Sequence, residues 1–262
     1  ACGVTKLRLT GGEPLMRSDL IEIVGLVSKI EGIKEISVTT NGILLTKELA
    51  INLKKAGLNR INISLDSLNP ERYKKITSGG KLADVLAGID AALLSSLKPL
   101  HLNVVLTKGI NDDEADDFIH FAKNNPVTVR FIELMPFLPN DEGKGFVPNS
   151  EILARHPYLI PVESASRAQP SLDYSAEGWQ GKVGFISPIT NKFCGDCNRV
   201  RLLSNGSLKP CLGSEEETDL KPFINDEALL IEAIKKAIFE KPKGHHFERG
   251  CTIGHSLQSI GG

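Results

Sequence analysis

The chain has 262 residues, 41% of them hydrophobic, and its 31 basic side chains nearly balance 32 acidic ones. A chain of this length and composition can bury a substantial core, either as one barrel-like domain or as two smaller domains. The near-zero net charge argues against a nucleic-acid or anionic-membrane partner, and no apolar run reaches the roughly 18 to 20 residues of a membrane span.

Short strand-like segments alternate with amphipathic segments through the first half of the chain, which is typical of βα units around a parallel sheet. The predicted strands are 4–10, 36–40, 59–65, 101–106 and 127–134. The first predicted helix is capped by Asp19 and ends at Gly32, and the others cover 47–56, 70–76, 83–96 and 112–123. Because the chain opens on Ala1-Cys2-Gly3 and runs at once into the first strand, we interpret it as an internal start.

Polar residues and glycines gather where these strands end. The four groups are Thr10-Gly11-Gly12-Glu13, Thr39-Thr40-Asn41-Gly42, Ser64-Leu65-Asp66 and Glu133-Leu134-Met135. The C-terminal ends of parallel strands form the ligand-binding edge of barrels and open sheets, so the groups are candidate site residues as a set. Taken singly, each could be no more than the turn that a βα connection needs.

The alternation stops after Pro136, and we place a domain boundary there, giving units 1–138 and 139–262. In the second unit we expect a short helix capped by Asn149 or Ser150, a strand over 182–187 and a last helix over 226–240. Asn205-Gly206 between the apolar-polar segments 199–204 and 207–209 predicts a β-hairpin.

Three cysteines in the second unit, Cys194, Cys197 and Cys211, have the spacing C-x₂-C-x₁₃-C. The predicted hairpin folds Cys211 back toward the other two, and three thiolates leave one coordination position open. This favours an iron–sulfur cluster with one free iron, while a zinc site would need a fourth ligand. The candidates for that fourth ligand are His245, His246, His255 and Cys251. Five cysteines, three of them clustered, indicate reduced thiols in an intracellular compartment.

Two further motifs point to small-molecule binding. Arg199 and Arg201 lie two residues apart on a predicted strand beside the cysteines, where both could bind a phosphate or carboxylate, or could form a solvated strand face. In Gly11-Gly12-Glu13-Pro14, two residues without Cβ would let an amino-acid moiety approach the backbone, although a simple turn also explains glycine there.

Together these motifs resemble the molybdenum cofactor biosynthesis protein A family, the radical S-adenosylmethionine GTP 3′,8-cyclases. The resemblance runs through essentially the whole chain in order. It is carried by the cysteine spacing and by Gly11–Pro14, Thr39–Gly42, Asn62–Asp66, Arg130–Glu133 and the terminal Gly261-Gly262. It implies an α/β fold, a partial (βα)₆ barrel of the TIM type lacking its first strand, plus a C-terminal iron–sulfur cluster domain.

The resemblance implies a lyase of molybdopterin synthesis that converts GTP to (8S)-3′,8-cyclo-7,8-dihydroguanosine 5′-triphosphate. One [4Fe–4S] cluster of the family cleaves S-adenosylmethionine, and a second binds the guanine. By motif, Cys194, Cys197 and Cys211 would hold the second cluster, and Gly12, Ser64 and Met135 would line the S-adenosylmethionine pocket. The residues that would contact GTP are Arg8, Thr39, His101, Arg130, Arg199, Val200 and Arg201. Gly261 and Gly262 would reach back into the active site as catalytic residues.

Two departures from the family qualify this expectation. The first-cluster motif, C-x₃-C-x₂-C, is absent, and His101 stands where the family commonly has a phosphate-binding lysine. We therefore expect the chain as given not to generate the radical, and the alternative is a truncated, non-catalytic form that binds one cluster and GTP. The expected partners are GTP, S-adenosylmethionine, an electron donor, a downstream cyclic pyranopterin synthase and a second copy in a homodimer. The pathway implies the cytoplasm of a bacterium or the mitochondrial matrix of a eukaryote.

Overall fold

The computed structural model describes the whole chain except residues 1, 137–144, 164–167, 246 and 248–262. Its helices are α1 (Leu20–Ser28), α2 (Lys47–Ala56), α3 (Pro70–Ile76), α4 (Leu82–Leu94), α5 (Ala115–Asn124), α6 (Asn149–Arg155) and α7 (Glu227–Phe239). Short 3₁₀ turns are η1 (Pro14–Met16), η2 (Asp112–Glu114), η3 (Cys194–Asp196) and η4 (Lys221–Phe223). The predicted helix 112–123 is thus a 3₁₀ turn followed by α5.

The strands form two sheets. They are β1 (Lys6–Leu9), β2 (Glu35–Thr40), β3 (Arg60–Ser64), β4 (Leu100–Val105), β5 (Thr128–Ile132), β6 (Ile160–Pro161), β7 (Leu172–Ser175), β8 (Lys182–Ile186), β9 (Arg201–Leu202), β10 (Ser207–Lys209) and β11 (Thr218–Asp219). The large sheet has the order β1-β2-β3-β4-β5-β8-β7-β6, and the small sheet has the order β11-β10-β9. Short strands β6, β7 and β11 lacked a recognisable pattern in the sequence.

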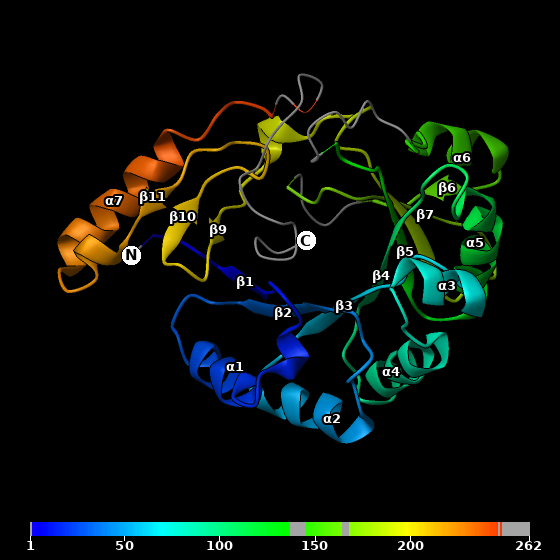
Figure 1. Cartoon of the computed structure of the whole chain (residues 1–262), viewed down its shortest axis with the longest axis horizontal. Coiled ribbons are helices and arrows are strands. Elements are labelled where there is room, and N and C mark those ends of the chain that lie inside the picture. Colours follow the sequence, from blue (N-terminus) through cyan, green and yellow to red (C-terminus); the bar gives the residue numbers. More distant parts are fainter. Residues whose placement is uncertain (1, 137–144, 164–167, 246, 248–262) are drawn as a thin grey trace.

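The large sheet is parallel from β1 through β5 to β8, and β7 and β6 join antiparallel. Figure 1 shows it curving, with α1, α2, α4, α3 and α5 on its outer side. The core lies between sheet and helices and includes Val38, Ile61, Leu102 and Phe131, all fully buried. The predicted βα alternation is confirmed, and β8 extends the same sheet although it follows the predicted domain boundary.

Local sequence explains where several elements begin and end. Gly57 ends α2 with φ of +114°, a left-handed conformation that glycine adopts without strain. Asp19 is the N-cap residue of α1 as predicted, but its carboxylate makes no cap bond because it pairs with Arg17 at 2.7 Å. The predicted cap at Asn149 or Ser150 is wrong, because Asn149 is already the first residue of α6 and its amide donates to carbonyls of the neighbouring strands. The predicted boundary at 138 lies outside the described residues.

The small sheet contains the predicted hairpin. β9 and β10 pair antiparallel through Leu202 with Leu208 and Arg201 with Lys209, and Gly206 adopts φ of +86° in the connecting turn. Helix α7 covers this sheet through a small core of Leu208, Leu220 and Ala237. The hairpin turns the chain after β10 back toward the segment before β9, as the cysteine spacing required.

Candidate functional site

The inner face of the large sheet is polar. Parallel strands alternate their side chains between faces, so the residues between the buried core positions point inward. Adjacent strands align Thr39 with Asn62, Asn62 with His101, and Asn103 with Arg130. The sequence carries this signal, for example in Arg60-Ile61-Asn62-Ile63-Ser64, but our strand predictions did not use it and missed Arg60 and Asn62.

Arginines from both sheets meet at this face. The pKa of Arg8 is lowered to about 10, first because surrounding protein reduces its hydration and then because of the charges of Arg60, Arg130, Arg199 and Arg201. Solvent still reaches the Arg8 side chain, so the site is open to small molecules although several arginines lie close together in it. The predicted residues Arg130, Arg199 and Arg201 therefore all lie within electrostatic reach of Arg8, although the four are far apart in sequence.

Arg130 is the most deeply buried member of this set. Burial lowers its pKa to about 10, and Arg60 adds to the effect while Asp173 and Glu35 oppose it. Its Nε has no hydrogen-bond partner among the described residues, and the same holds for the buried Oδ1 of Asn103 on the neighbouring strand. Gly184 on β8 leaves room here, because a Cβ would stand 3.4 Å from Cγ of Arg130 and 2.2 Å from Oγ of Ser171. Buried polar atoms without partners are expected where a ligand binds.

His101 is buried among these arginines and is neutral. Its pKa falls to about 2, first through burial and then through the charges of Arg130, Arg60 and Arg8. The amide nitrogen of Asn62 donates to the Val38 carbonyl (3.2 Å) and to Oγ1 of Thr39 (3.3 Å). Its oxygen therefore accepts from Nδ1 of His101 at 3.0 Å, which leaves Nε2 as an acceptor. Thr39 is thus linked to His101 through Asn62.

The Gly11-Gly12-Glu13-Pro14 loop is fixed by its glutamate. One oxygen of Glu13 accepts from the backbone N of Leu15 (3.0 Å) and from Oγ1 of Thr40 (2.5 Å), and the other accepts from the N of Asn41 (2.8 Å). Gly11 has φ of +91°, and a Cβ on Gly12 would meet open space. The glutamate therefore ties the β1 loop to the end of β2, with Gly12 facing outward from the loop.

The remaining predicted contacts have different surroundings. Ser64 is exposed at the C-terminal end of β3, aligned with Asn103. Met135 packs instead with Leu203 and Phe247 of the C-terminal region. The side chain of Val200 packs toward the core beneath α7, so only its backbone is available beside Arg199 and Arg201. Gly261 and Gly262 lie outside the described residues.

The three cysteines are all partly buried and unpaired. Cys194 is the first residue of η3 and Cys197 follows its last. Burial and the charge of Arg199 lower the pKa of Arg201, and Cys211 and Cys197 lie close enough to oppose that shift. Burial raises the pKa of Cys197, but hydrogen bonds and charge from Arg199, together with the charge of Lys241, outweigh it and bring the pKa to about 7. A thiol that ionises near neutral pH in cationic surroundings suits a metal ligand. Three free thiols are the kind of donor that an iron–sulfur cluster needs, but among the described residues, the three cysteines included, no group of three or more His, Cys, Asp and Glu side chains is placed to hold a single metal ion.

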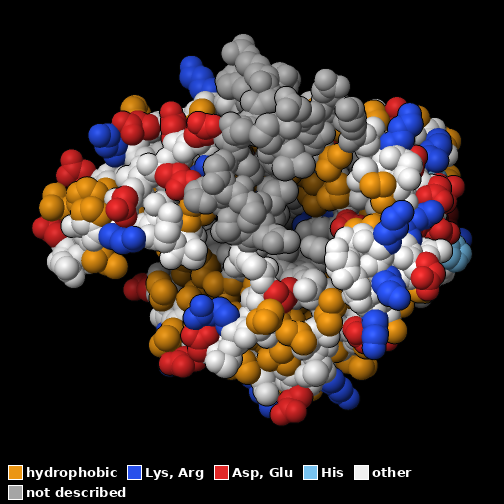
Figure 2. Space-filling view, viewed as in Figure 1, with side chains coloured by type: hydrophobic (Ala, Val, Ile, Leu, Met, Phe, Trp, Pro, Cys, Tyr) orange, Lys and Arg blue, Asp and Glu red, His pale blue; other side chains and the backbone are white. Residues whose placement is uncertain are grey.

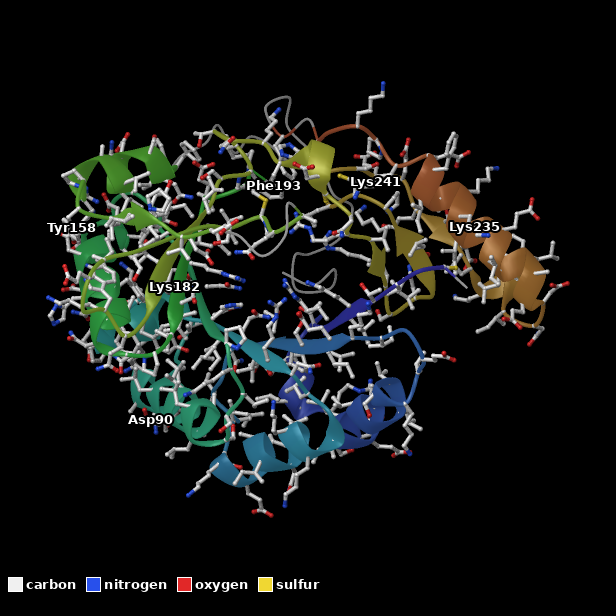
Figure 3. The ribbon with its side chains drawn as sticks, turned by 180° about the vertical axis from the view of Figure 1, so that it is seen from behind. Asp90, Tyr158, Lys182, Phe193, Lys235 and Lys241 are labelled. Carbon is white, nitrogen blue, oxygen red and sulfur yellow. The ribbon has the colours of Figure 1, made fainter. Side chains whose placement is uncertain are left out.

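Two cationic groups hold the cysteine segment, and only Arg199 was predicted. The Arg199 guanidinium lies 5.0 Å from the centre of the Phe193 ring. The ammonium of Lys241 donates to the carbonyls of Cys197 and Arg199, each at 2.8 Å, and to Sγ of Cys197 at 3.3 Å. Figure 3 shows Phe193 and Lys241 on either side of η3. A lysine that follows a helix is common in sequences, and no local pattern predicts that it binds a segment far away in the chain.

A second set of contacts that the sequence did not predict joins the end of β5 to the start of α6 and to the loop after β8. Glu133, which is 1% exposed, accepts from the backbone N of Asn149, Ile189 and Thr190 at 3.0 to 3.2 Å, and from the Thr190 hydroxyl. The amide of Asn149 donates to the carbonyls of Phe131 and Ile186. Glu133 thereby fixes the loop that leads from β8 to the cysteines.

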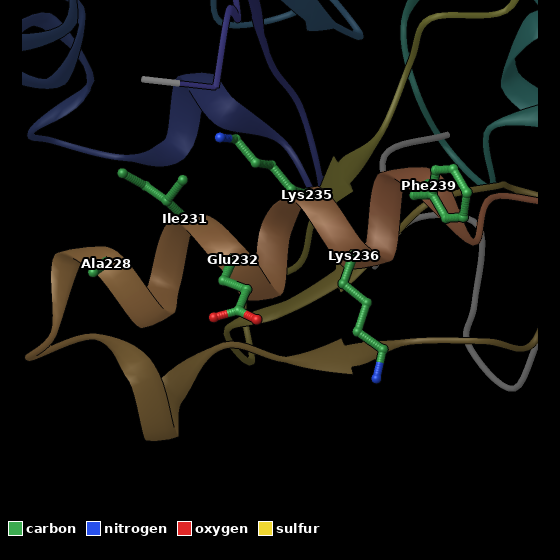
Figure 4. Close-up of a pocket in the computed structure, with 6 residues that line it drawn as sticks. All are labelled: Ala228, Ile231, Glu232, Lys235, Lys236 and Phe239. Atoms are coloured by element: carbon green, nitrogen blue, oxygen red, sulfur yellow. The ribbon is translucent and has the colours of Figure 1, made fainter.

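Other surfaces lack these features. A shallow depression along α7, lined by Ile231, Lys235 and Phe239 among others, contains none of the predicted site residues (Figure 4). On the face in Figure 2, basic and acidic side chains are interspersed. No helix in the described part of the chain is long and apolar enough to cross a bilayer. His246, Cys251 and His255 lie outside the described part of the chain.

Comparison with known proteins assigns both halves of the chain. The Radical SAM superfamily matches residues 1–122, and Molybdenum Cofactor Synthesis C matches residues 127–247. A GTP 3′,8-cyclase of Clostridium botulinum (strain Langeland) is 45% identical to this chain over an alignment of 267 positions. The alignment covers 99% of this chain and 82% of that protein. The chain belongs to the GTP 3′,8-cyclase family. Membership of the radical SAM superfamily implies an iron–sulfur cluster and S-adenosylmethionine.

Other members of the GTP 3′,8-cyclase family match to a similar extent. The protein of Alkaliphilus oremlandii is 48% identical over 93% of this chain and 76% of its own length, and that of Moorella thermoacetica is 43% identical over 99% and 82%. A solved domain of pyruvate-formate lyase-activating enzyme from Bacteroides vulgatus covers 59% of this chain and 90% of its own, with a TM-score of 0.46 at 20% identity. The family assignment rests on the sequence relatives.

Proposed function

We propose that this chain binds GTP between the polar face of its large sheet and its cysteine segment, and converts it to (8S)-3′,8-cyclo-7,8-dihydroguanosine 5′-triphosphate. The observation that carries the proposal is the meeting of Arg8 and Arg130 from the large sheet with Arg201 of β9 and Arg199, which lies just before it. Cationic side chains this close repel one another until an anion binds, and a triphosphate provides the charge and the length to contact several of them.

We assign the cysteine triad to the cluster beside the substrate. Cys194, Cys197 and Cys211 would hold a [4Fe–4S] cluster, which when bound supplies one iron with an open position for a small molecule. Arg199 and Arg201 would lie beside that cluster, so a guanine bound there would leave its phosphates near Arg8 and Arg130. The backbone of Val200 lies between the two arginines. Gly12, Ser64 and Met135 would contact S-adenosylmethionine, and Gly261 and Gly262 would complete the active site.

His101 has a defined part in this proposal. As a neutral ring with its Nδ1 proton engaged by Asn62, it offers Nε2 as an acceptor within the arginine group. It can therefore accept a hydrogen bond from an arginine and orient that guanidinium, but it adds no positive charge toward phosphate. Thr39, linked to it through Asn62, would contact GTP from the neighbouring strand.

The architecture that we propose is a partial (βα)₆ barrel of TIM type joined to a C-terminal cluster domain, with units 1–138 and 139–262. Six parallel strands with helices on their outer side support the barrel, and β8 comes from the second unit. The relatives named above are bacterial, which favours the cytoplasmic location over the mitochondrial one. The electron donor, the downstream cyclic pyranopterin synthase and a homodimer remain predictions.

Anaerobic reconstitution tests the proposal. We expect about four iron atoms per chain and GTP binding that requires the loaded cluster. Stoichiometric zinc without iron would contradict it. Addition of S-adenosylmethionine and a reductant then separates the enzyme from the alternative of a non-catalytic fragment. Release of 5′-deoxyadenosine supports the enzyme, and GTP binding without that release supports the fragment.

A further inference from the structure

Lys241 makes three hydrogen bonds to the segment that contains Cys197 and Arg199. Its ammonium donates to both backbone carbonyls at 2.8 Å and to the Cys197 sulfur at 3.3 Å. A lysine ammonium has three N–H donors, so this set of acceptors uses all of them. Two of the three acceptors are backbone carbonyls, which means that the segment is held whether or not the sulfur has a metal.

The lysine is itself held in place from a distance. It follows the end of α7, and its backbone N donates to the Ile238 carbonyl at 3.3 Å. The helix is anchored by Ala237 and its neighbours against Leu208 and Leu220 of the small sheet. Lys241 thus reaches 44 residues back along the chain to Cys197, and its side chain links the end of α7 to the cysteine segment.

We propose that Lys241 is a positioning residue for the cluster, which clamps the Cys197–Arg199 segment and donates a hydrogen bond to the ligating sulfur. The inference rests on the proposed function, because it takes Cys197 as a cluster ligand. Hydrogen bonds to cluster sulfurs and nearby positive charge favour the reduced form, which carries one more negative charge, and so raise the reduction potential. The same ammonium holds the carbonyl of Arg199, so it also sets where that arginine stands relative to the cluster.

Lys241→Met in the reconstituted chain tests this directly. Methionine is unbranched and of similar length but has no donor or charge. We expect Lys241→Met to give a cluster whose reduction potential, measured by anaerobic spectroelectrochemical titration, is more negative than that of the unchanged chain. GTP affinity should also fall, because Arg199 loses its restraint. Lys236→Met is the matched control, since Lys236 is exposed on α7, points away from the helix in Figure 4 and pairs only loosely with Glu240 at 4.0 Å.

The outcomes are separable. A potential in Lys241→Met equal to that of the unchanged chain and of Lys236→Met would overturn the inference, whereas a selective negative shift supports it. Loss of iron from Lys241→Met with an intact circular dichroism spectrum also supports it, because the ligand segment is then no longer held. Failure of the unchanged chain to bind iron would instead reject the proposed function. If Lys241→Met does not fold, Lys241→Gln takes its place, since glutamine keeps N–H donors but has no charge. The same measurement of the cluster's reduction potential then decides.

Discussion

The large sheet and the cysteine region place their functional side chains in different ways. Arg8, Arg60, His101 and Arg130 stand on strands whose opposite faces are packed under helices, so backbone register fixes them. Cys194, Cys197 and Arg199 stand in loops beside a three-stranded sheet with a small core, and individual polar contacts hold them. We therefore expect a single polar substitution to displace the functional side chains of the cysteine region, the second region, far more than those of the large sheet, the first region.

The cysteine triad should show the largest effect. Cys211→Ala removes one of three proposed ligands, and we expect almost complete loss of iron after anaerobic reconstitution because two thiolates cannot retain the cluster. Cys2→Ala is the control, since Cys2 lies near the start of β1, and it should retain iron like the unchanged chain. Equal iron in the two variants would remove Cys211 from the ligand set.

Glu133→Gln should have the next largest effect. The change replaces a buried carboxylate that accepts from Asn149, Ile189 and Thr190 by an amide with one fewer accepting oxygen. We expect the free energy of unfolding in urea to fall by about 2 to 4 kcal/mol, since a buried donor is left facing another donor. Glu177→Gln, on an exposed turn, should change it little. A result for Glu133→Gln as small as that for Glu177→Gln would show that the loop after β8 is not held by this carboxylate.

His101→Gln tests the first region and should have a smaller, pH-dependent effect. The pKa of His101 is about 2 in the folded chain and about 6.5 when unfolded, so the unfolded chain takes up the proton first as pH falls below 6.5. The unchanged chain should therefore lose about 1 kcal/mol more stability than His101→Gln between pH 7 and pH 5.5. Urea unfolding at the two pH values, with His120→Gln as control, measures it. An identical pH dependence in all three chains would contradict a buried neutral His101.

The sequence predicted the first region better than the second. Hydrophobic periodicity located α1 to α4 and β1 to β5, because the pattern of buried and exposed positions depends on local sequence, but α1 ends at Ser28 and not at the predicted Gly32. It also placed Cys211 near Cys197, because Asn205-Gly206 specifies a hairpin. The contacts of Lys241 with Cys197 and of Glu133 with Thr190 join residues 44 and 57 positions apart, and no local pattern encodes such pairs. The Asp19 carboxylate likewise makes no cap bond to α1, because it accepts from the Arg17 guanidinium instead.

The most direct test of the account is GTP binding measured by calorimetry in the iron-loaded chain with Arg130→Ala, with Arg199→Ala, and with both changes. One arginine comes from each region, and each should weaken GTP binding by about 10- to 100-fold, as expected for hydrogen bonds to a charged group. Guanosine, which has no phosphates, should bind all three variants alike, and Arg155→Ala on the outer helix α6 should bind GTP normally. Loss of affinity in only one of the two single variants, with full iron content in both, would contradict a substrate site shared by the two regions.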